Sequence, residues 1–194
     1  MKINKIYDDV YEILDFVTEE EQQLILHFAS EITEDEWFNQ DKEKQYVKYT
    51  SDWWKGKLIH FPHNLILQDI NKRVEGLFES YDTTSPIAAI GRHKMYQSMN
   101  PHRDDFKKQG DWYIRYGIVI YYNDNYNGGE IDYPEINIKI KPKARSLLLH
   151  GGKVLHGTTP VLDDRIRYFS TAFIRGSEAK PVILNKEIFG EDNE

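Results

Sequence analysis

A histidine and an aspartate, His102 and Asp104, stand two residues apart near the middle of the chain. Side chains alternate between the two faces of a strand, so at a strand end this spacing places an imidazole and a carboxylate on one face. With a distant second histidine they would form a 2-His-1-carboxylate triad, a ligand set that leaves one side of Fe(II) open. The H-x-D spacing alone is weak, because a loop histidine and a solvated turn aspartate would look the same.

Three segments downstream carry the residue types that such a site would need. Tyr121 opens the stretch YYNDNYNGGEIDYP, KPKARSLLLH leads from a proline turn into an apolar strand, and His156 precedes a Pro-Val pair and the arginines Arg165 and Arg167. Each segment has an ordinary structural explanation, as a hairpin, a buried strand, or a loop histidine followed by a surface arginine. The order of the segments is therefore more informative than any one of them.

In this order the segments resemble the 2-oxoglutarate- and Fe(II)-dependent oxygenases, in their prolyl-4-hydroxylase-like branch. The resemblance runs from about Lys94 to Ile174 and consists of H-x-D, Y-x-N-D with G-G-E, K-P-x-A-x-S-L-L-L, H-x-x-x-P-V and R-Y-x-S-x-x-F. It implies an α+β protein built on a double-stranded β-helix (jelly roll) with N-terminal buttressing helices. It also implies Fe(II), 2-oxoglutarate and O₂, together with ascorbate, which the family often uses.

The resemblance implies that His102, Asp104 and His156 are the iron ligands. It also implies an arginine that pairs with the far carboxylate of 2-oxoglutarate, because a guanidinium presents two parallel N–H donors to a carboxylate. We prefer Arg167, since a serine and a phenylalanine stand three and six positions beyond it, as in the family. Arg165 is the reserve candidate, because the spacing from His156 to Arg167 is one residue longer than the family leads us to expect. Both arginines are expected on one face of a strand.

Tyrosines are the remaining candidates for the co-substrate pocket. By resemblance, the Tyr121 hydroxyl would hydrogen-bond a carboxylate of 2-oxoglutarate, although a core tyrosine on a strand is the ordinary alternative. Tyr96, on the strand that leads to the H-x-D motif, is a weaker candidate for the co-substrate or substrate pocket. His150 falls where the family has an aromatic or aliphatic residue, so we expect it to pack. The other histidines have no partner pattern and are expected to be surface or structural residues: His27, His60, His63 and His93.

The activity that the resemblance implies is hydroxylation of an unactivated C–H, with decarboxylation of 2-oxoglutarate to succinate and CO₂. The substrate would be a prolyl or other residue of a protein or peptide. One alternative keeps the cofactors and places a free amino acid, a small metabolite or an alkylated nucleobase in the pocket. Another is a non-catalytic jelly-roll binding or sensing module. A third is catalytic zinc on the same ligands, which lacks an evident general base and does not account for the arginine.

Aromatic and charged residues outside these motifs are candidates to cover or line the entrance to the site. Ordinary packing or solvation is the alternative for all of them. They are the pair Trp53 and Trp54, the loop Asp105–Asp111, and the residues Arg92, Trp112 and Arg115.

The elements that must position these residues change in type along the chain. We expect one domain over 1–194, with helical support over 1–85, a jelly-roll core over 86–176 and a C-terminal extension over 177–194. Thr18 and Glu21 have the spacing of a helix capping box, and apolar residues at steps of three and four predict a second helix after Pro62. The predicted strands are Ile87–Tyr96, Tyr113–Tyr122, Glu130–Tyr133, Ile136–Ile140, Ser146–His150 and Ile166–Ile174.

Composition excludes several other classes of protein. The 194 residues include no cysteine, which excludes disulfide scaffolds, thiolate-bound zinc, iron–sulfur clusters and thiol nucleophiles. The net charge of −7 argues mildly against a nucleic-acid partner. Without a signal-peptide pattern or a continuous apolar run of about 20 residues, a soluble cytoplasmic protein that binds no membrane is expected. The partner would be a protein, peptide or small-molecule substrate, and the oligomeric state stays open.

Overall fold

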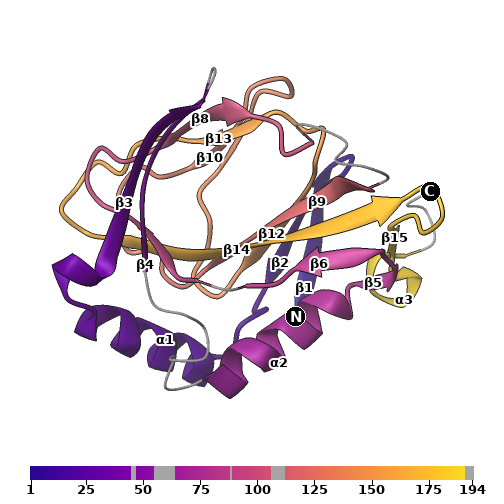
Figure 1. The fold of residues 1–194 in the computed structure, drawn as a ribbon, viewed down its shortest axis with the longest axis horizontal. Helices are drawn as coiled ribbons and strands as arrows, with labels where there is room; N and C mark the ends of the chain where they lie inside the picture. Colours follow the sequence, from indigo (N-terminus) through magenta and orange to yellow (C-terminus); the bar gives the residue numbers. More distant parts are fainter. Residues whose placement is uncertain (45–46, 55–63, 88, 106–111, 191–194) are drawn as a thin grey trace.

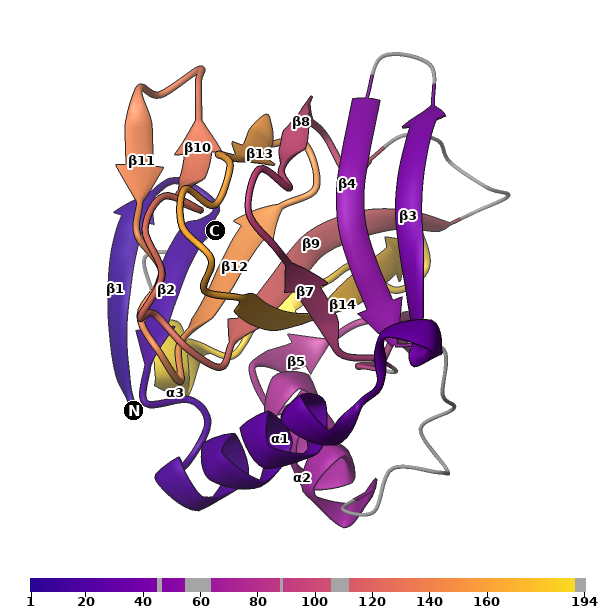
Figure 2. The ribbon, with the colours of Figure 1, turned by 90° about the vertical axis from the view of Figure 1, so that its left-hand side faces the viewer.

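Antiparallel strands in two facing layers, with helices against the outside of the larger layer, make up the fold (Figures 1 and 2). The structure is a computed structural model, and it describes the whole chain except residues 45–46, 55–63, 88, 106–111 and 191–194. Among the described residues, no helix combines the length and apolar character needed to cross a membrane.

The larger layer contains the long central strands. Its hydrogen-bonded order is β1-β2-β12-β9-β14-β7-β4, while β3 pairs with β4 and β6 pairs with β14. Its strands are β1 (Lys2–Tyr7), β2 (Val10–Leu14), β3 (Trp37–Lys44), β4 (Val47–Trp54), β6 (Thr83–Ser85), β7 (Gly91–His93), β9 (Trp112–Tyr121), β12 (Leu147–Gly151) and β14 (Arg167–Ser177).

The smaller layer consists of four short strands in the order β8-β13-β10-β11, and β8 joins it to the larger layer by pairing with β4. These strands are β8 (Met99–His102), β10 (Ile131–Tyr133), β11 (Ile138–Ile140) and β13 (His156–Thr158). The remaining elements are α1 (Glu19–Glu31), the 3-10 turn η1 (Glu34–Glu36), α2 (Asn64–Glu75), β5 (Phe78–Ser80), β15 (Ile183–Leu184) and α3 (Lys186–Phe189).

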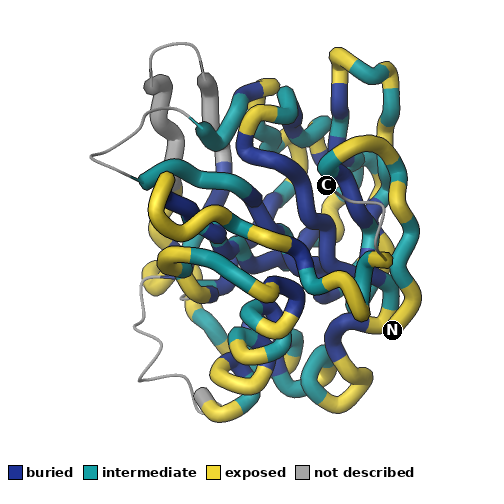
Figure 3. Tube along the Cα trace, turned by 90° about the vertical axis from the view of Figure 1, so that its right-hand side faces the viewer, coloured by how far each residue is buried: buried dark blue, intermediate teal, exposed yellow. Residues whose placement is uncertain are grey.

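The central strands serve two cores because their side chains alternate between two faces. In β9, Ile118 and Ile120 belong to the outer core, which includes Ile25 of α1 and buried residues of α2, whereas Tyr121 belongs to the inner core between the layers. In β12, Leu147 and Leu149 lie in the outer core and Leu148 in the inner one. Figure 3 shows that the buried residues concentrate in the interior of the fold. The fold class expected from the sequence, a jelly roll with buttressing helices, is confirmed.

The start of α1 is fixed by the predicted capping box. The Thr18 hydroxyl accepts from the backbone N–H of Glu21 at 3.2 Å, and the Glu21 carboxylate accepts from the backbone N–H of Thr18 at 2.8 Å. Glu21 also accepts two 2.7 Å hydrogen bonds from Arg73 of α2. One glutamate thus caps the first helix and ties it to the second.

The first 85 residues contain more strand than the sequence led us to expect. The region also contributes β1 and β2, which extend the larger layer beyond β12, and the β3–β4 hairpin, which lies at the opposite end of that layer (Figure 2). The two strands of the β3–β4 hairpin have the sequences WFNQDKEK and VKYTSDWW. Neither shows the regular alternation of apolar and polar residues that would have predicted a strand. The predicted strand Ile87–Tyr96 shortens to β7, and β13 was not predicted.

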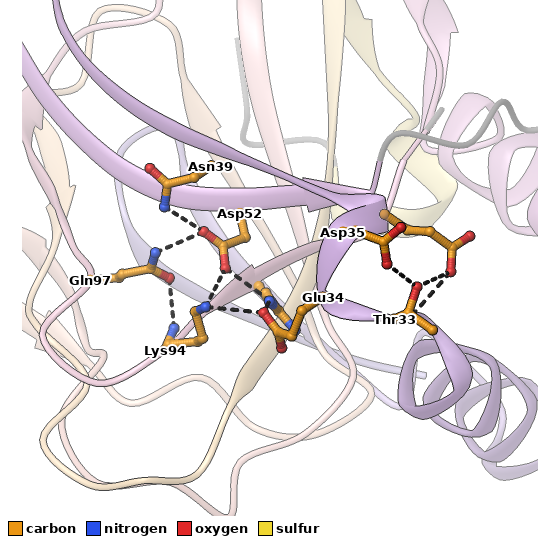
Figure 4. A network of polar contacts seen from close by, with 9 residues as sticks. Thr33, Glu34, Asp35, Asn39, Asp52, Lys94 and Gln97 are labelled. Carbon is orange, nitrogen blue, oxygen red and sulfur yellow. Dashed lines mark hydrogen bonds and ion pairs between the residues drawn. The ribbon is translucent and has the colours of Figure 1, made fainter.

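A buried ionic network fastens the β3–β4 hairpin to β7 (Figure 4). The Asp52 side chain is 2% exposed and accepts from Arg92 Nε at 3.0 Å, from Asn39 Nδ2 at 2.7 Å and from Gln97 Nε2 at 2.9 Å. Arg92 also pairs with Glu34 at 2.6 Å. Burial alone would raise the pKa of Asp52, but these hydrogen bonds outweigh it and hold the pKa below its usual value.

We predict that Asp52→Asn lowers the free energy of unfolding by about 3 kcal/mol, because the amide removes the buried carboxylate beside Arg92 and leaves this arginine only the exposed Glu34. Urea unfolding measures the change. The matched control is Asp69→Asn on α2, where the exposed pair with Lys72 at 3.4 Å should contribute little. Equal effects of the two substitutions would contradict this account of the hairpin.

Candidate metal and carboxylate site

Two short strands of the smaller layer bring the predicted triad together. His102 is the last residue of β8 and His156 the first residue of β13, and the two face each other in the register of this antiparallel pair. Side chains opposite each other in such a pair lie on one face with their Cβ atoms about 5 Å apart. Asp104 follows His102 by two residues. The ligand atoms of the three side chains all lie within 4.8 Å of one another.

The two histidines present the same nitrogen to the centre of this cluster. His102 Nδ1 lies 2.9 Å from the carbonyl oxygen of Asn100, and His156 Nδ1 lies 3.0 Å from that of Val154. Because a carbonyl oxygen only accepts, each Nδ1 carries the proton and each Nε2 carries the lone pair. These Nε2 atoms lie 3.7 and 3.9 Å from the nearest oxygen of Asp104.

Burial keeps this cluster in the protonation state that a metal requires. It lowers the pKa of His102 and lowers the pKa of His156 to about 3, so both imidazoles are neutral at pH 7. Burial alone would raise the pKa of Asp104, but His150 and the neighbouring imidazoles outweigh it, and the pKa lies below its usual value. Two neutral imidazoles and one carboxylate are thus available without proton release.

A buried arginine without an acidic partner lies in the same interior space. Arg167, the first residue of β14, is 2% exposed, and its Nη1 donates to the carbonyl oxygen of Gly129 at 3.4 Å. Its guanidinium carbon lies 5.1 Å from the ring centres of both Tyr121 and Phe169. Among the described residues no carboxylate forms an ion pair with Arg167, and its Nε has no hydrogen-bond partner. A buried charge in this condition lacks the anion that would normally accompany it.

The Tyr121 hydroxyl is the second unsatisfied polar group beside this arginine. It is buried and has no partner within the described part of the chain. Burial raises the pKa of Tyr121 well above its usual value, so the phenol is neutral and able to donate. Arg167 and Tyr121 together offer hydrogen-bond donors to one acceptor-rich ligand.

One cavity of about 70 Å³ joins the triad to the arginine. At roughly 10–15 Å³ for each water, it has room for about five water molecules. Much of its wall is aliphatic or aromatic. The cavity is lined by His93, Met99, His102, Asp104, Ile118, Val119, Tyr121, Ile131, His150, His156, Thr158, Arg167, Phe169, Thr171 and Phe173.

Two other predicted residues lie outside this cavity. Arg165 precedes β14 rather than sharing a strand face with Arg167, and its exposed side chain contacts Asp163 at 3.3 Å and the Asn125 carbonyl oxygen at 2.6 Å. Tyr96 is 71% exposed, has a positive φ of 68° and does not line the cavity.

The predicted entrance residues have different surroundings. Trp53 packs edge-on against Phe169 of the cavity wall, with 5.3 Å between ring centres, whereas Trp54 belongs to the outer core. Arg115 is held by two 2.9 Å hydrogen bonds to Asp9. Trp112 lies beneath the guanidinium of Arg175, Arg92 is in the buried network described above, and 106–111 lie outside the described residues.

Two histidines of the cavity were not assigned to the site from the sequence. His150 was expected to pack, but its Nε2 lies 3.4 Å from Asp104 Oδ2. His93 is fully buried, lies opposite Arg167 in the β7–β14 register and contacts the Ser51 hydroxyl through Nε2 at 2.6 Å. The alternation in SLLLH places His150 and Leu148 on one strand face, but it does not say which face meets the cavity.

No protein-family model matches the sequence, and no curated protein matches it. Solved structures do resemble the fold. A collagen prolyl hydroxylase of Paramecium bursaria Chlorella virus-1, solved as a 2OG complex, superposes with a TM-score of 0.62 at 16% identity over 88% of this chain and 97% of that one. A Pseudomonas putida prolyl-4-hydroxylase gives a TM-score of 0.64 at 15% identity over 87% and 93%.

A third solved structure is a prolyl hydroxylase of Trichoplax adhaerens in complex with a hypoxia-inducible-factor peptide fragment. It gives a TM-score of 0.59 at 14% identity over 86% of this chain and 83% of that one. The chain therefore has the double-stranded β-helix fold of these hydroxylases.

We predict that Arg167→Met stabilises the ligand-free protein by about 2 kcal/mol, because it removes an unpaired buried charge and keeps a flexible side chain of similar length. The urea midpoint should rise. In the matched control, Arg73→Met removes an arginine that is paired with Glu21 and should not raise it. A fall in the midpoint for Arg167→Met would show that an unseen partner satisfies this charge.

Proposed function

We propose that this chain is an Fe(II)- and 2-oxoglutarate-dependent dioxygenase that hydroxylates an unactivated C–H of a prolyl or other residue in a protein or peptide. The observation that carries the proposal is the unpaired, buried Arg167 in the same cavity as the triad. A metal site alone would not require a buried arginine, whereas a co-substrate with a carboxylate at each end accounts for both.

The triad fits a divalent iron. His102 Nε2 lies 3.7 Å from Asp104 Oδ1 and His156 Nε2 lies 3.9 Å from Asp104 Oδ2, somewhat longer than the roughly 3–3.5 Å that separates two ligands placed about 2.1 Å from one metal, so small side-chain movements would bring all three onto one ion. Two imidazoles and one carboxylate on one side are the donor set of non-haem Fe(II) oxygenases. Bound iron would supply the oxygen activation that couples decarboxylation of 2-oxoglutarate to C–H hydroxylation, yielding succinate and CO₂.

The far end of the cavity suits the second carboxylate of the co-substrate. Arg167 would pair with both of its oxygens, and the Tyr121 hydroxyl would donate a further hydrogen bond. Val119, Ile131 and Phe169 form apolar walls of the cavity, and they limit water around the reacting groups. In this assignment His102, Asp104, His156 and Arg167 form the catalytic set.

The substrate would approach from outside, because the co-substrate fills so small a cavity. A hollow of about 680 Å³ reaches Asp105, the residue after Asp104, and is lined by Asp9, Asp105, Tyr113, Ile114, Arg115, Gly152 and Lys153. Its mixed charges suit a peptide better than a phosphate backbone, which would want clustered basic residues. A complex of a hydroxylase of this fold with a peptide supports the same choice. Ascorbate, as a reductant that restores iron, is part of the proposal.

We predict that anaerobic addition of Fe(II) and 2-oxoglutarate to the metal-free protein produces the weak visible charge-transfer band of an iron–keto-acid chelate. His156→Ala should abolish the band, because it removes one of three ligands. His27→Ala, at an exposed position of α1, is the control and should keep it. Correctly folded wild-type protein without the band would favour the binding-module alternative, and turnover with Zn²⁺ alone would favour a zinc enzyme.

Arg167→Ala should raise the 2-oxoglutarate concentration needed for half-maximal succinate formation roughly 100-fold, the loss expected for about 3 kcal/mol of charge-assisted hydrogen bonding. Arg165→Ala is the matched control on the neighbouring exposed arginine, and it should change this 2-oxoglutarate concentration little. The reverse ranking would assign the carboxylate to Arg165.

A further inference from the structure

His150 contacts the carboxylate of the triad from a third strand. Its Nε2 lies 3.4 Å from Asp104 Oδ2, and its ring centre lies 3.9 Å from that of His156, with 41° between the ring planes. The side chain is buried, and its Nδ1 has no hydrogen-bond partner among the described residues. A phenylalanine would fill this space without that unsatisfied nitrogen, so packing alone does not explain a histidine.

The proton on His150 can be placed from its neighbour. A carboxylate only accepts hydrogen bonds, and a lone pair facing Oδ2 would be repelled, so Nε2 of His150 carries the proton. His102 and His156 have the opposite tautomer, with the proton on Nδ1 and the lone pair on Nε2. Asp104 is therefore surrounded by two nitrogens suited to bind a metal and one N–H suited to bind a carboxylate oxygen.

The backbone leaves space for this contact at Gly117. In the β12–β9 register Gly117 lies opposite His150, and in the β14–β9 register it lies opposite Phe173. A Cβ at Gly117 would clash with Asp104 Oδ2 and lie 2.7 Å from His150 Nε2. Three neighbouring strands thus form a notch for one carboxylate oxygen, with His150 on one side and Phe173 on the other.

We infer that His150 is a positioning residue that fixes the orientation of the Asp104 carboxylate by holding Oδ2 in this notch, so that Asp104 binds the metal through a single oxygen. The inference rests on the proposed function. A carboxylate that bound through both oxygens would occupy one more coordination position, and the triad would leave fewer positions for a chelating co-substrate and O₂. His150 thereby preserves the open side of the metal site without touching the metal.

The test uses Co²⁺ alone as a spectroscopic probe of the metal site. We compare the dissociation constant and the visible d–d spectrum for wild type, His150→Phe and His150→Gln. His150→Phe should weaken Co²⁺ binding roughly 10- to 100-fold and change the band intensities, as loss of a hydrogen bond to a ligating group does. His150→Gln, which restores an N–H donor, should recover most of the Co²⁺ affinity and most of the wild-type band intensities. His27→Phe is the exposed control and should match wild type.

The outcomes separate this inference from the proposed function. If wild type binds Co²⁺ and His150→Phe has the same affinity and spectrum, the positioning role is wrong and the proposed function stands. If folded wild type binds no Co²⁺, both are wrong.

A second variant tests the notch without altering His150, should His150→Phe not fold. Gly117→Ala should push Oδ2 away from His150 and cause the same weakening and spectral change. Gly76→Ala is its control, because a Cβ there meets only ordinary contacts at 3.4 and 3.5 Å. A wild-type spectrum and affinity in Gly117→Ala would overturn the inference.

Discussion

The strict alternation of side chains along β9, β12 and β14 is the constraint on which the rest of the structure depends. One face of these strands is apolar and packs beneath α1 and α2, and this packing holds the larger layer in place. The other face is free to carry Arg167, His150 and the Gly117 notch, because the helix-covered core already stabilises the strands. A shift of one residue in any of these strands would exchange the two faces and remove the site.

The site was more predictable than the scaffold that holds it. His102, Asp104, His156 and Arg167 could be proposed because their order along the chain resembles that of a known family, and the structure places all four around one cavity. The β3–β4 hairpin could not, because its attachment depends on the buried Asp52–Arg92 pair, which joins residues far apart in the sequence. Local propensity contains no information about such a pair.

The sequence also could not predict which histidines face the cavity, for a geometric reason. His93 and His150 belong to strands whose face toward the cavity becomes clear only once the partners of β7 and β12 are known. Similarly, Arg165 and Arg167 differ by one strand boundary, and strand boundaries are the least certain part of a sequence-based assignment. The chemistry of each side chain could be read from the sequence. The direction in which each side chain points could be known only from the pairing register of its strand.

The unpaired charge of Arg167 has a consequence for the lifetime of the protein in a cell. A dianion that pairs with it binds only the folded chain, so the folded population rises with the concentration of that ligand. Proteases and chaperones act on the unfolded fraction, and a change of one or two kcal/mol is enough to alter abundance several-fold. The supply of a small carboxylate would thus set how much of this protein survives, in addition to how fast it works.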